Sequence, residues 1–350
     1  MSDTVYVNLS DLADLTAEIC VIIVNYNSGA YLGRCLAALA EQDRRDFLSV
    51  VFDNASTDDS LINLQKVPDH TFLVAFEENI GFSKANNLVG MVVKCKWIVT
   101  LNPDAIVSPN WLEKMMEATV RYPDVPVFGS TLVNDLVRDV IDGSGDCYSP
   151  LGVVWRGNHG RSISELPQEG EVFSACAAAA LYRADAFRLV GGFDEAFFCY
   201  CEDVDIAFRL RLAGYSCVQV RDAVAYHYGS HSLGEKSNFA VYHSYRNRLW
   251  TFVKNMPTPL FQVLFPLHLL ASLGLLLREF AAGRGKAAWA GLRDGLKNLR
   301  GPIKQARRDV QSRRCVSITS ILRAMTWSPK KMIMRHHDVR QRTRFGTTKL

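Results

Sequence analysis

The sequence predicts an α/β protein with a central, mostly parallel sheet, followed by a helical region of different character. Two observations predict the sheet. The first 130 residues alternate short β-branched runs with helical patterns, and the 350-residue chain is 48% hydrophobic, which is enough for a full core. A third observation separates the end of the chain, because residues 259–277 carry no formal charge. We therefore expect a large α/β domain over residues 1–255 and a helical region over residues 256–350.

The predicted strands and helices follow one another in the order that βαβ units require. The run ICVIIVN at 19–25 is typical of a buried parallel strand, and a helix capped by Ser28 is expected after it. The other predicted strands are 47–53, 71–76, 97–102 and 216–221, and the other predicted helices begin after Asp59, near Phe82 and at Ser108.

Polar residues follow four of these strands, at the edge where parallel sheets bind their ligands. Any one of them is consistent with a turn or a helix cap, because Asn and Asp are common in both. Four on one edge favour a binding site. Neither a Gly-x-Gly-x-x-Gly after the first strand nor a Gly-x-x-x-x-Gly-Lys-Ser/Thr is present, which argues against dinucleotide dehydrogenases and P-loop enzymes. The four polar groups are Asn25-Tyr26-Asn27, Asp53-Asn54, Glu78-Asn79 and Asn102-Pro103-Asp104.

A cluster of three carboxylates lies in the segment FCYCEDVDIAFR, residues 198–209. If a helix begins near Glu202, Asp205 and Arg209 can form an i,i+4 ion pair, while Asp203 lies away from that pair on an apolar side. Apolar surroundings raise the pKa of a carboxyl group, so Asp203 can accept a proton near neutral pH, as a general base must. The alternative is that Asp203 only caps the helix.

Nine cysteines, an odd number, are scattered mostly through apolar runs, which is typical of buried, reduced thiols in a cytosolic protein. Cys199 and Cys201 have no second Cys/His pair at zinc-finger spacing, so we expect no zinc site. The N-terminus lacks the basic and apolar segments of a signal peptide, and none is expected.

The charge is distributed unevenly along the chain. From Arg278 onward there are 19 Lys and Arg against 4 Asp and Glu, a balance of +15, whereas the first 277 residues hold 21 against 32, a balance of −11. A basic tail of this kind suits a phosphate-rich partner, either nucleic acid or an anionic membrane. The tail has no finger, no helix-turn-helix signature and no interleaved aromatic residues, so we expect no nucleic acid partner.

The composition of the tail favours a membrane surface. The uncharged run 259–277 is of borderline length for a membrane span. The next helix, over residues 285–300, places Trp289 and Leu292 on one face and basic residues off it, as membrane-surface helices do. The alternative is a helix that packs on the core and exposes a solvated basic face.

Seven blocks, in order between residues 19 and 230, resemble the inverting nucleotide-sugar glycosyltransferases of family 2, which have a GT-A fold. Within that family the chain is most similar to bacterial rhamnosyltransferases. The blocks are Val24–Asn27, Asp53–Ser56, Asn79–Asn86, Leu101–Asp104, Gly191–Glu195, Glu202–Asp205 and Tyr226–His227.

The resemblance implies a role for each site residue. Asp203 is then the general base, and Asp194 and Glu202 orient the acceptor and its loop. Asp104 takes the family's Asp-x-Asp position and binds Mg²⁺ or Mn²⁺, with His227 as a second metal or diphosphate contact. The sequence departs from that pattern at the uncharged Asn102, so tight metal binding without the nucleotide is not expected. The implied nucleotide contacts are Tyr26, Asn27, Asp53, Asn54, Asn79, Asn86 and Asn102.

The resemblance also implies a reaction and a location. The expected activity is metal-dependent, inverting transfer of a sugar, most favourably L-rhamnose from dTDP-rhamnose, to a polyprenol-linked or cell-surface glycan. The expected location is the cytoplasmic face of the plasma membrane, and a homo-oligomer is left open. The alternatives are a transferase for another sugar and a non-catalytic nucleotide-sugar-binding or scaffold protein with this fold. Sugar choice is expected to depend on the pocket around Trp155 and residues 142–145.

Overall fold

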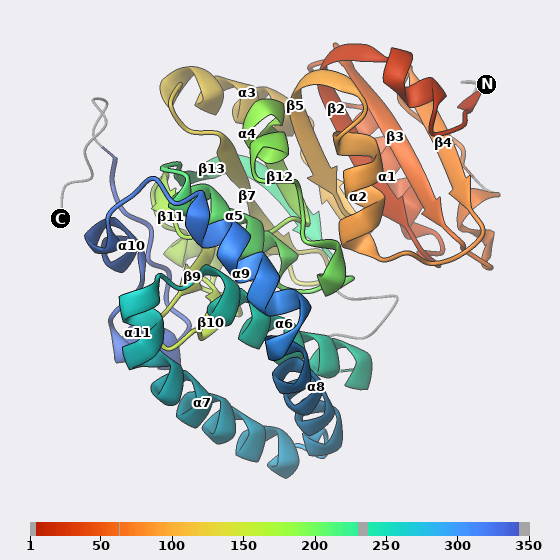
Figure 1. Cartoon of the computed structure of the whole chain (residues 1–350). Helices are drawn as coiled ribbons and strands as arrows, with labels where there is room; N and C mark the ends of the chain where they lie inside the picture. The colour runs from red at the N-terminus through yellow and green to blue at the C-terminus, as the bar shows by residue number, and fades with distance from the viewer. Residues whose placement is uncertain (1–4, 63, 230–236, 343–350) are drawn as a thin grey trace.

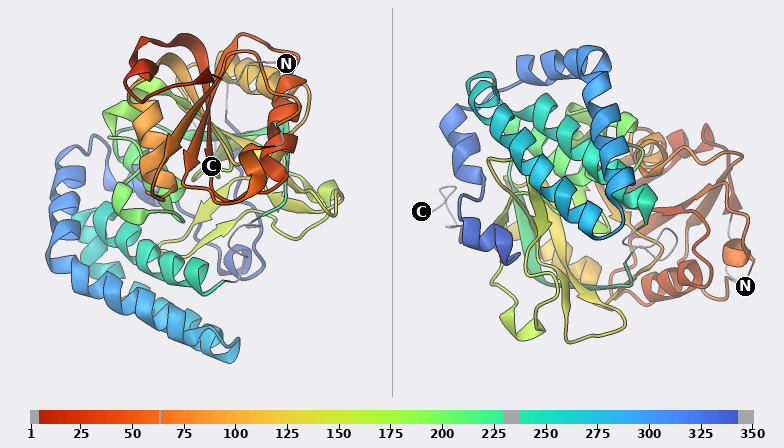
Figure 2. Two further views of the ribbon diagram at one scale, coloured as in Figure 1. Left: turned by 90° about the vertical axis from the view of Figure 1, so that its right-hand side faces the viewer. Right: turned by 90° about the horizontal axis from the view of Figure 1, so that it is seen from below.

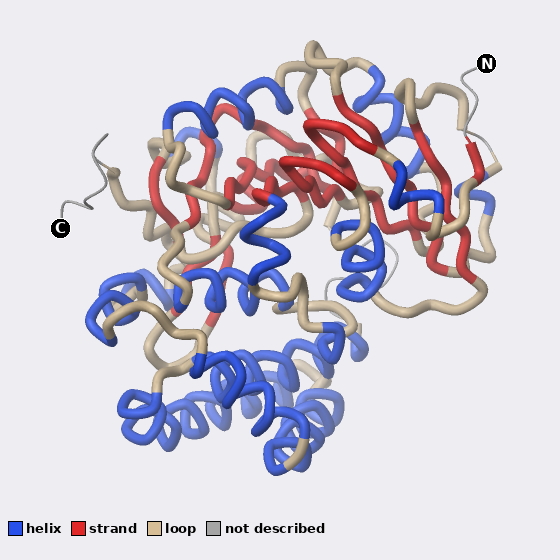
Figure 3. Tube along the Cα trace, turned by 45° about the horizontal axis from the view of Figure 1, so that its top comes forward, coloured by secondary structure: helices blue, strands red, loops and turns tan. Residues whose placement is uncertain are grey.

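The structure, a computed structural model, describes residues 5–62, 64–229 and 237–342. One large twisted sheet occupies the upper part of the molecule in Figure 1, and most of the C-terminal helices lie below it. Figure 3 shows the same separation between strands and helices. The remaining residues of the predicted regions 1–255 and 256–350, namely 1–4, 63, 230–236 and 343–350, lie outside the described residues.

The first half of the sheet is parallel, as the alternating pattern predicts. Strands β2 (Thr16–Asn25), β3 (Phe47–Asn54), β4 (Thr71–Phe76) and β5 (Lys94–Leu101) pair in the order β4-β3-β2-β5, and β1 (Val5–Tyr6) extends the β4 edge. All four predicted strands of this half are confirmed. The register aligns the end of β2 with the end of β3, so their polar ends share one edge.

The second half of the sheet is mixed. Strand β12 (Ala179–Arg183) runs antiparallel between β5 and β7 (Val127–Asn134), and β7 pairs in parallel with β13 (Cys217–His227). The strand predicted at 216–221 is therefore longer than expected. Short strands complete the architecture: β11 (Gly170–Val172) and β6 (Ala105–Val107) pair with β13, β8 (Ile141–Gly143) pairs with β7, and β9 (Asp146–Tyr148) pairs with β10 (Val154–Arg156).

The helices between the strands correct two local predictions. Ser28 does not cap a helix, because its hydroxyl donates to Asn25 and the helix begins at Tyr31. The segment after Asn54 forms only a short 3₁₀ turn, where the Asp58 side chain caps the backbone and satisfies it locally. The helices of this part are α1 (Tyr31–Ala40), α2 (Phe82–Gly90), α3 (Trp111–Arg121), α4 (Ala184–Leu189) and α5 (Glu202–Leu212).

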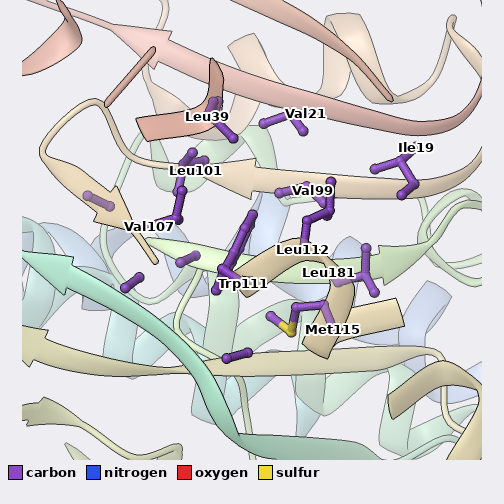
Figure 4. Packing of buried hydrophobic residues seen from close by; sticks show 14 of the residues in the cluster. Ile19, Val21, Leu39, Val99, Leu101, Val107, Trp111, Leu112, Met115 and Leu181 are labelled. Carbon is purple, nitrogen blue, oxygen red and sulfur yellow. The ribbon is translucent and has the colours of Figure 1, made fainter. Parts of the chain in front are cut away.

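Two hydrophobic cores cover the two faces of the sheet. Strand β2 contributes Val21 and Ile23 to one core and Ile22 and Val24 to the other, because successive strand side chains point to opposite faces. Figure 4 shows the first core, where Trp111 of α3 packs among residues of β2 and β5. The buried indole nitrogen of Trp111 donates to Ser130, 2.8 Å away. The sheet is therefore rigid beneath its ligand-binding edge.

The C-terminal helices form a third core with α5. That core contains Phe208 of α5 together with Phe252, Leu276, Leu292 and Ile321 from the later helices. Both views of Figure 2 show this layer packed against the sheet domain. The boundary between residues 255 and 256 stays a prediction. The helices are α6 (Asn238–Asn255), α7 (Thr258–Ala281), α8 (Gly285–Lys297), α9 (Pro302–Ser312), α10 (Ile318–Ala324) and α11 (Pro329–Ile333).

Candidate functional site

A cavity of about 490 Å³ lies at the carboxyl ends of the parallel strands, where open α/β sheets bind ligands. The sheet edge forms one wall, and residues of α5 and α6 form another. Trp155 and Arg156 of β10 also line it, and the Trp155 indole is held by the His336 carbonyl, 2.9 Å away. Eight of the predicted site residues line this cavity: Tyr26, Asn54, Asn79, Asn102, Asp104, Glu202, Asp203 and His227.

Four predicted site residues do not line the cavity, and their roles stay predictions. Asp53 accepts hydrogen bonds from Asn25, 2.8 Å away, and from the Ser56 amide. It therefore links the ends of β2 and β3 without lining the cavity. The others bond to nearby structure: Asn27 accepts from the Thr57 amide, Asn86 donates to the Phe82 carbonyl, and Asp194 pairs with Lys254.

A chain of charged groups crosses the sheet-edge wall. Strands β6 and β13 pair so that Ala105 lies opposite His227, which brings Asp104 next to the imidazole. A carboxylate oxygen of Asp104 lies 3.5 Å from His227 Nε2, and Asp142 lies 2.8 Å from Nδ1 on the other side. Asp142 in turn pairs with Arg156 at 2.6 Å. The wall therefore presents an ordered carboxylate and imidazole to the cavity.

Burial and neighbouring charges shift the pKa values of these groups in opposite directions. Burial alone lowers the pKa of His227, but the carboxylates of Asp104 and Asp142 outweigh it and raise that pKa to about 9. Burial alone raises the pKa of Asp104, but the attraction of His227 holds it below its usual value. Arg156, His159 and His227 likewise outweigh the effect of burial and lower the pKa of Asp142. Without a ligand, the wall holds a protonated imidazole between two carboxylates.

The donors on this wall fit a divalent cation that also takes oxygen ligands from a substrate. Asp104 supplies a hard carboxylate oxygen, and a cation that displaces the proton from His227 Nε2 would gain an imidazole nitrogen whose partner nitrogen is already held by Asp142, as is usual for metal-binding histidines. The Asn102 amide lies 3.5 Å from Nε2. Within the described ranges, no group of three or more His, Cys, Asp and Glu residues could hold a metal. Asp104 and His227 are two candidate ligands, and ions such as Mg²⁺ usually complete their coordination with water and the phosphate oxygens of a substrate.

The lining also contains three acidic side chains whose pKa values are raised by burial. Burial raises the pKa of Asp203, although amide donors from Ala177 and Val204, at 3.2 and 2.8 Å, oppose the shift. Burial and the charge of Asp203 raise the pKa values of Glu202 and Asp146 well above their usual range. Asp203 is the best hydrogen-bonded of the three in its charged form, so it is the group best suited to exchange a proton.

Helix α5 begins where the sequence predicts, at Glu202, and the predicted Asp205–Arg209 pair is present at 2.7 Å. The alternative role for Asp203, a helix cap, is excluded because Cys201 occupies the N-cap position. Asp203 stands inside the first turn, where its carboxylate is also favoured by the helix dipole.

The loop before α5 is strained and clamped. Phe198, Tyr200 and Cys201 have φ values of 66°, 69° and 66°, a region that costs roughly 1–3 kcal/mol for each non-glycine residue. The side-chain amide of Asn247 on α6 donates to the carbonyls of Phe197, Cys199 and Tyr200 at 3.0, 2.8 and 2.8 Å. The clamp holds Asp203 in place by fixing the backbone that leads into its helix.

Several residues of the cavity could not be predicted from the sequence. Asp146, Arg156, Tyr245 and Arg248 line the cavity, and Asn247 supports it, yet these residues come from β9, β10 and α6, far along the chain from the polar strand ends. The Gly-rich segment 142–146 gave the one available signal, because it carries an aspartate at each end.

The arrangement supports a displacement reaction on a phosphorylated substrate. Asp104 and His227 suit a diphosphate group that binds together with a divalent cation, and Asp203 in the same cavity offers a carboxylate that can take a proton. In the lining of the cavity, no cysteine has the lowered pKa of an activated nucleophile: burial raises the pKa values of Cys176, Cys199 and Cys201.

Comparisons with known proteins agree with this geometry. The family described as "Glycosyl transferase family 2" matches residues 20–191. N-acetylglucosaminyl-diphospho-decaprenol L-rhamnosyltransferase of Mycobacterium tuberculosis (strain CDC 1551 / Oshkosh) is 29% identical over 260 residues, which cover 65% of this chain and 82% of that protein. Rhamnosyltransferase WbbL of Escherichia coli (strain K12) is 28% identical over 228 residues, covering 60% of this chain and 83% of that protein.

Solved structures show the same fold at low identity. The crystal structure of GalNAc-T7 with UDP, GalNAc and Mn²⁺ superposes with a TM-score of 0.65 at 12% identity, covering 93% of this chain and 59% of that one. The mannosyltransferase PcManGT from Pyrobaculum calidifontis, in complex with GDP-Man and Mn²⁺, gives a TM-score of 0.50 at 18% identity, covering 89% and 88%. The predicted GT-A fold is confirmed. Residues 20–191, just under half of the chain, therefore match a family 2 glycosyltransferase domain, and the relatives of the chain include proteins named as rhamnosyltransferases.

Proposed function

We propose that this glycosyltransferase moves L-rhamnose from dTDP-rhamnose, with inversion, to a polyprenol-diphosphate-linked or growing surface glycan. The observation that carries the proposal is one cavity that holds Asp203 on one wall and Asp104 with His227 on the other. The names of two relatives support the choice of rhamnose, and one of those names specifies a diphospho-decaprenol acceptor.

In the proposed reaction, Asp203 takes the proton of an acceptor hydroxyl as its oxygen attacks the anomeric carbon of the donor. The bond from that carbon to the diphosphate oxygen breaks, and its electron pair leaves with the nucleoside diphosphate. A single displacement inverts the anomeric centre and needs no enzyme nucleophile. The transition state is oxocarbenium-like, as in other glycosyl transfers. Glu202, next to Asp203 in the first turn of α5, helps to position the acceptor.

The donor binds along the sheet edge. Tyr26, Asn54 and Asn79 contact the nucleoside, and the Asn54 and Asn79 amides already hold each other at 2.7 Å. Asp104 and His227 would hold Mg²⁺ or Mn²⁺ next to the diphosphate. When bound, such an ion offsets the negative charge that develops on the leaving group. Structures of two fold neighbours with Mn²⁺ support this assignment.

Transfer from a panel of nucleotide sugars tests the proposed donor. We expect product from dTDP-rhamnose with an N-acetylglucosaminyl-diphosphoprenol acceptor, and loss of product when EDTA removes divalent cations, because the diphosphate charge is then uncompensated. Added Mn²⁺ or Mg²⁺ should restore the rate, and nucleotide binding measured by calorimetry should require the same ion. Faster transfer from a different nucleotide sugar would contradict the proposed donor, and full activity in EDTA would contradict the metal.

The second part of the proposal concerns α7, whose polarity is the reverse of a soluble surface helix. Its inward face buries His268, Ser272 and Glu279, whereas its outward face exposes Leu270 at 66% and Leu277 at 63%. It is the helix, among the described residues, that is long and apolar enough to cross a membrane. Figure 1 shows it along the lower edge of the molecule. The other large exposed apolar residues of this face are Val263, Leu267, Leu273 and Phe280.

We assign the occupant of this apolar face as a lipid bilayer surface, with α7 lying in the plane of the interface. A membrane-spanning orientation is disfavoured because polar His268, Ser272 and Glu279 are committed to contacts with the rest of the protein. The charge from Arg278 onward, +15, matches anionic headgroups at the cytoplasmic face. Trp289 of α8, 49% exposed, is suited to the interface. The enzyme would then meet a lipid-linked acceptor in the plane of the membrane.

Substituting Leu270 and Leu277 together by aspartate should weaken binding to vesicles of anionic phospholipid at least tenfold, because each leucine loses burial worth about 1.5–3 kcal/mol. Sedimentation with liposomes measures this. The matched control is Leu189→Asp on α4, a leucine 55% exposed away from α7, which should bind as the wild type does. Unchanged vesicle binding by the double variant would contradict the membrane assignment. A wild-type protein that is a dimer in solution and a double variant that is a monomer would show that another copy of the chain covers this face instead.

A further inference from the structure

Among the described residues, three cationic side chains line the cavity, and one of them has no acidic partner in that part of the chain. Arg156 and His227 both bond to Asp142. Arg248 of α6 forms no ion pair with any described residue. Its Nε is buried without a hydrogen-bond partner, and one terminal nitrogen donates to Ser272 at 3.0 Å. A partly buried charge without a counter-ion is costly, so a bound anion would be stabilised next to Arg248.

The surroundings of Arg248 hold its guanidinium in a fixed position. The group lies over the ring of Tyr245, 5.0 Å from the ring centroid, and its bond to Ser272 ties it to α7. A planar guanidinium that is held in this way offers two parallel donors, which match the oxygens of a phosphate group. The arrangement suits an anion with paired oxygens, such as a phosphate group, better than a chloride ion.

Arg248 comes from a different part of the fold from the residues proposed to hold the donor diphosphate. Asp104 and His227 lie at the strand ends, whereas Arg248 lies on α6 beside α7. Ser272 faces inward, and Leu270 and Leu273 on the same helix face outward. The guanidinium therefore lies on the inner side of α7, roughly one helix diameter, about 10 Å, from the apolar face. An anion bound to Arg248 would therefore lie on the α7 side of the cavity.

We propose that Arg248 binds a phosphate group of a prenyl-diphosphate-linked acceptor and thereby anchors the acceptor with its sugar directed at Asp203. The inference rests on the proposed glycosyl transfer and adds the residue that recognises the acceptor. Tyr245 positions the guanidinium, and Ser272 couples it to the membrane-facing helix.

The test uses the full-length protein and two separate probes, geranyl diphosphate for the acceptor phosphate and dTDP for the donor. Calorimetry should show that Arg248→Met weakens binding of geranyl diphosphate about 10- to 100-fold, the range expected for lost charged hydrogen bonds, while dTDP binds with its wild-type affinity. The affinity of Arg248→Lys for geranyl diphosphate should lie between those of the wild type and Arg248→Met, because lysine keeps the positive charge but lacks the paired donors of a guanidinium. The matched control is Arg293→Met on α8, an arginine with a half-exposed side chain.

A second measurement needs no variant: geranyl diphosphate should inhibit the wild-type enzyme competitively against the acceptor and not against the nucleotide sugar. Weaker dTDP binding by Arg248→Met, with geranyl diphosphate unaffected, would assign the arginine to the donor and overturn the proposal. Equal loss for both probes with a lower melting temperature, together with inhibition that is not competitive with the acceptor, would also overturn it. If dTDP-rhamnose is not a donor but Arg248 still governs binding of geranyl diphosphate, only the proposed sugar is wrong.

Discussion

Asp203→Asn should lower kcat by a factor of roughly 10²–10⁴, the usual contribution of a general base. Asparagine keeps the shape of the side chain and can still accept the amide hydrogen of Ala177, 3.2 Å away in the wild type, but it cannot take a proton from the acceptor. The KM for the nucleotide sugar should stay close to its wild-type value. Initial rates of rhamnose transfer at saturating and limiting donor measure both quantities.

The pH profile provides an independent check on the same residue. A base works only when it is deprotonated, so activity falls as the pH drops through its pKa. Because burial raises the pKa of Asp203, the acid limb of kcat/KM should lie above the ordinary aspartate value of about 3.9. The residual activity of Asp203→Asn should lack this limb. A variant with near wild-type kcat and an unchanged profile would show that another group, such as Glu202, takes the proton.

Lys254→Met should destabilise the protein by about 3–5 kcal/mol, the cost of breaking a buried ion pair from one side. The Lys254 side chain is 2% exposed, and its ammonium lies 2.5 Å from Asp194 and 2.7 Å from Asp205, which is fully buried. Methionine fills the space but leaves both carboxylates with less compensation. Denaturant unfolding monitored by circular dichroism gives the free energy difference.

Two comparisons separate the charge effect from a packing effect. Adding Asp194→Asn to Lys254→Met should recover part of the loss, because one uncompensated charge disappears, whereas Lys297→Met, at a side chain 67% exposed, should change stability by no more than about 0.5 kcal/mol. Burial raises the pKa of Asp205, but Lys254 and Arg209 outweigh it and hold the pKa low. The wild type should therefore be more stable to unfolding than Lys254→Met at neutral pH, and this difference should shrink as the pH falls through the lowered pKa of Asp205. A difference independent of pH would indicate lost packing.

The sequence predicts the strands, the polar sheet edge and the start of α5 because each depends on neighbouring residues. Buried β-branched runs predict β2 to β5, and the i,i+4 spacing of Asp205 and Arg209 predicts their ion pair. The failures at Ser28 and after Asn54 have one cause. In each case a short polar side chain forms a local hydrogen bond instead of capping the predicted helix. The Ser28 hydroxyl, for example, donates to Asn25.

The acceptor side of the site was less predictable, because it depends on packing between distant segments. No local pattern indicates that Asn247 clamps residues 197–200, or that Arg248 lacks an acidic partner in the described structure. The tail gives a similar lesson. Its apolar run was visible in the sequence, but the inward placement of His268 and Ser272, which favours an in-plane helix over a span, required the fold.

The clamp of Asn247 has a consequence for how an acceptor is chosen. Asn247 fixes the loop that positions Asp203, and Arg248 is the next residue on the same helix. One rigid helix thus sets the separation between the base and the proposed phosphate contact. The site would then act as a ruler, which selects an acceptor hydroxyl by its distance from the phosphate as well as by the identity of the sugar. An acceptor with one more sugar between the two would hold its hydroxyl out of register, and we expect slower transfer to it.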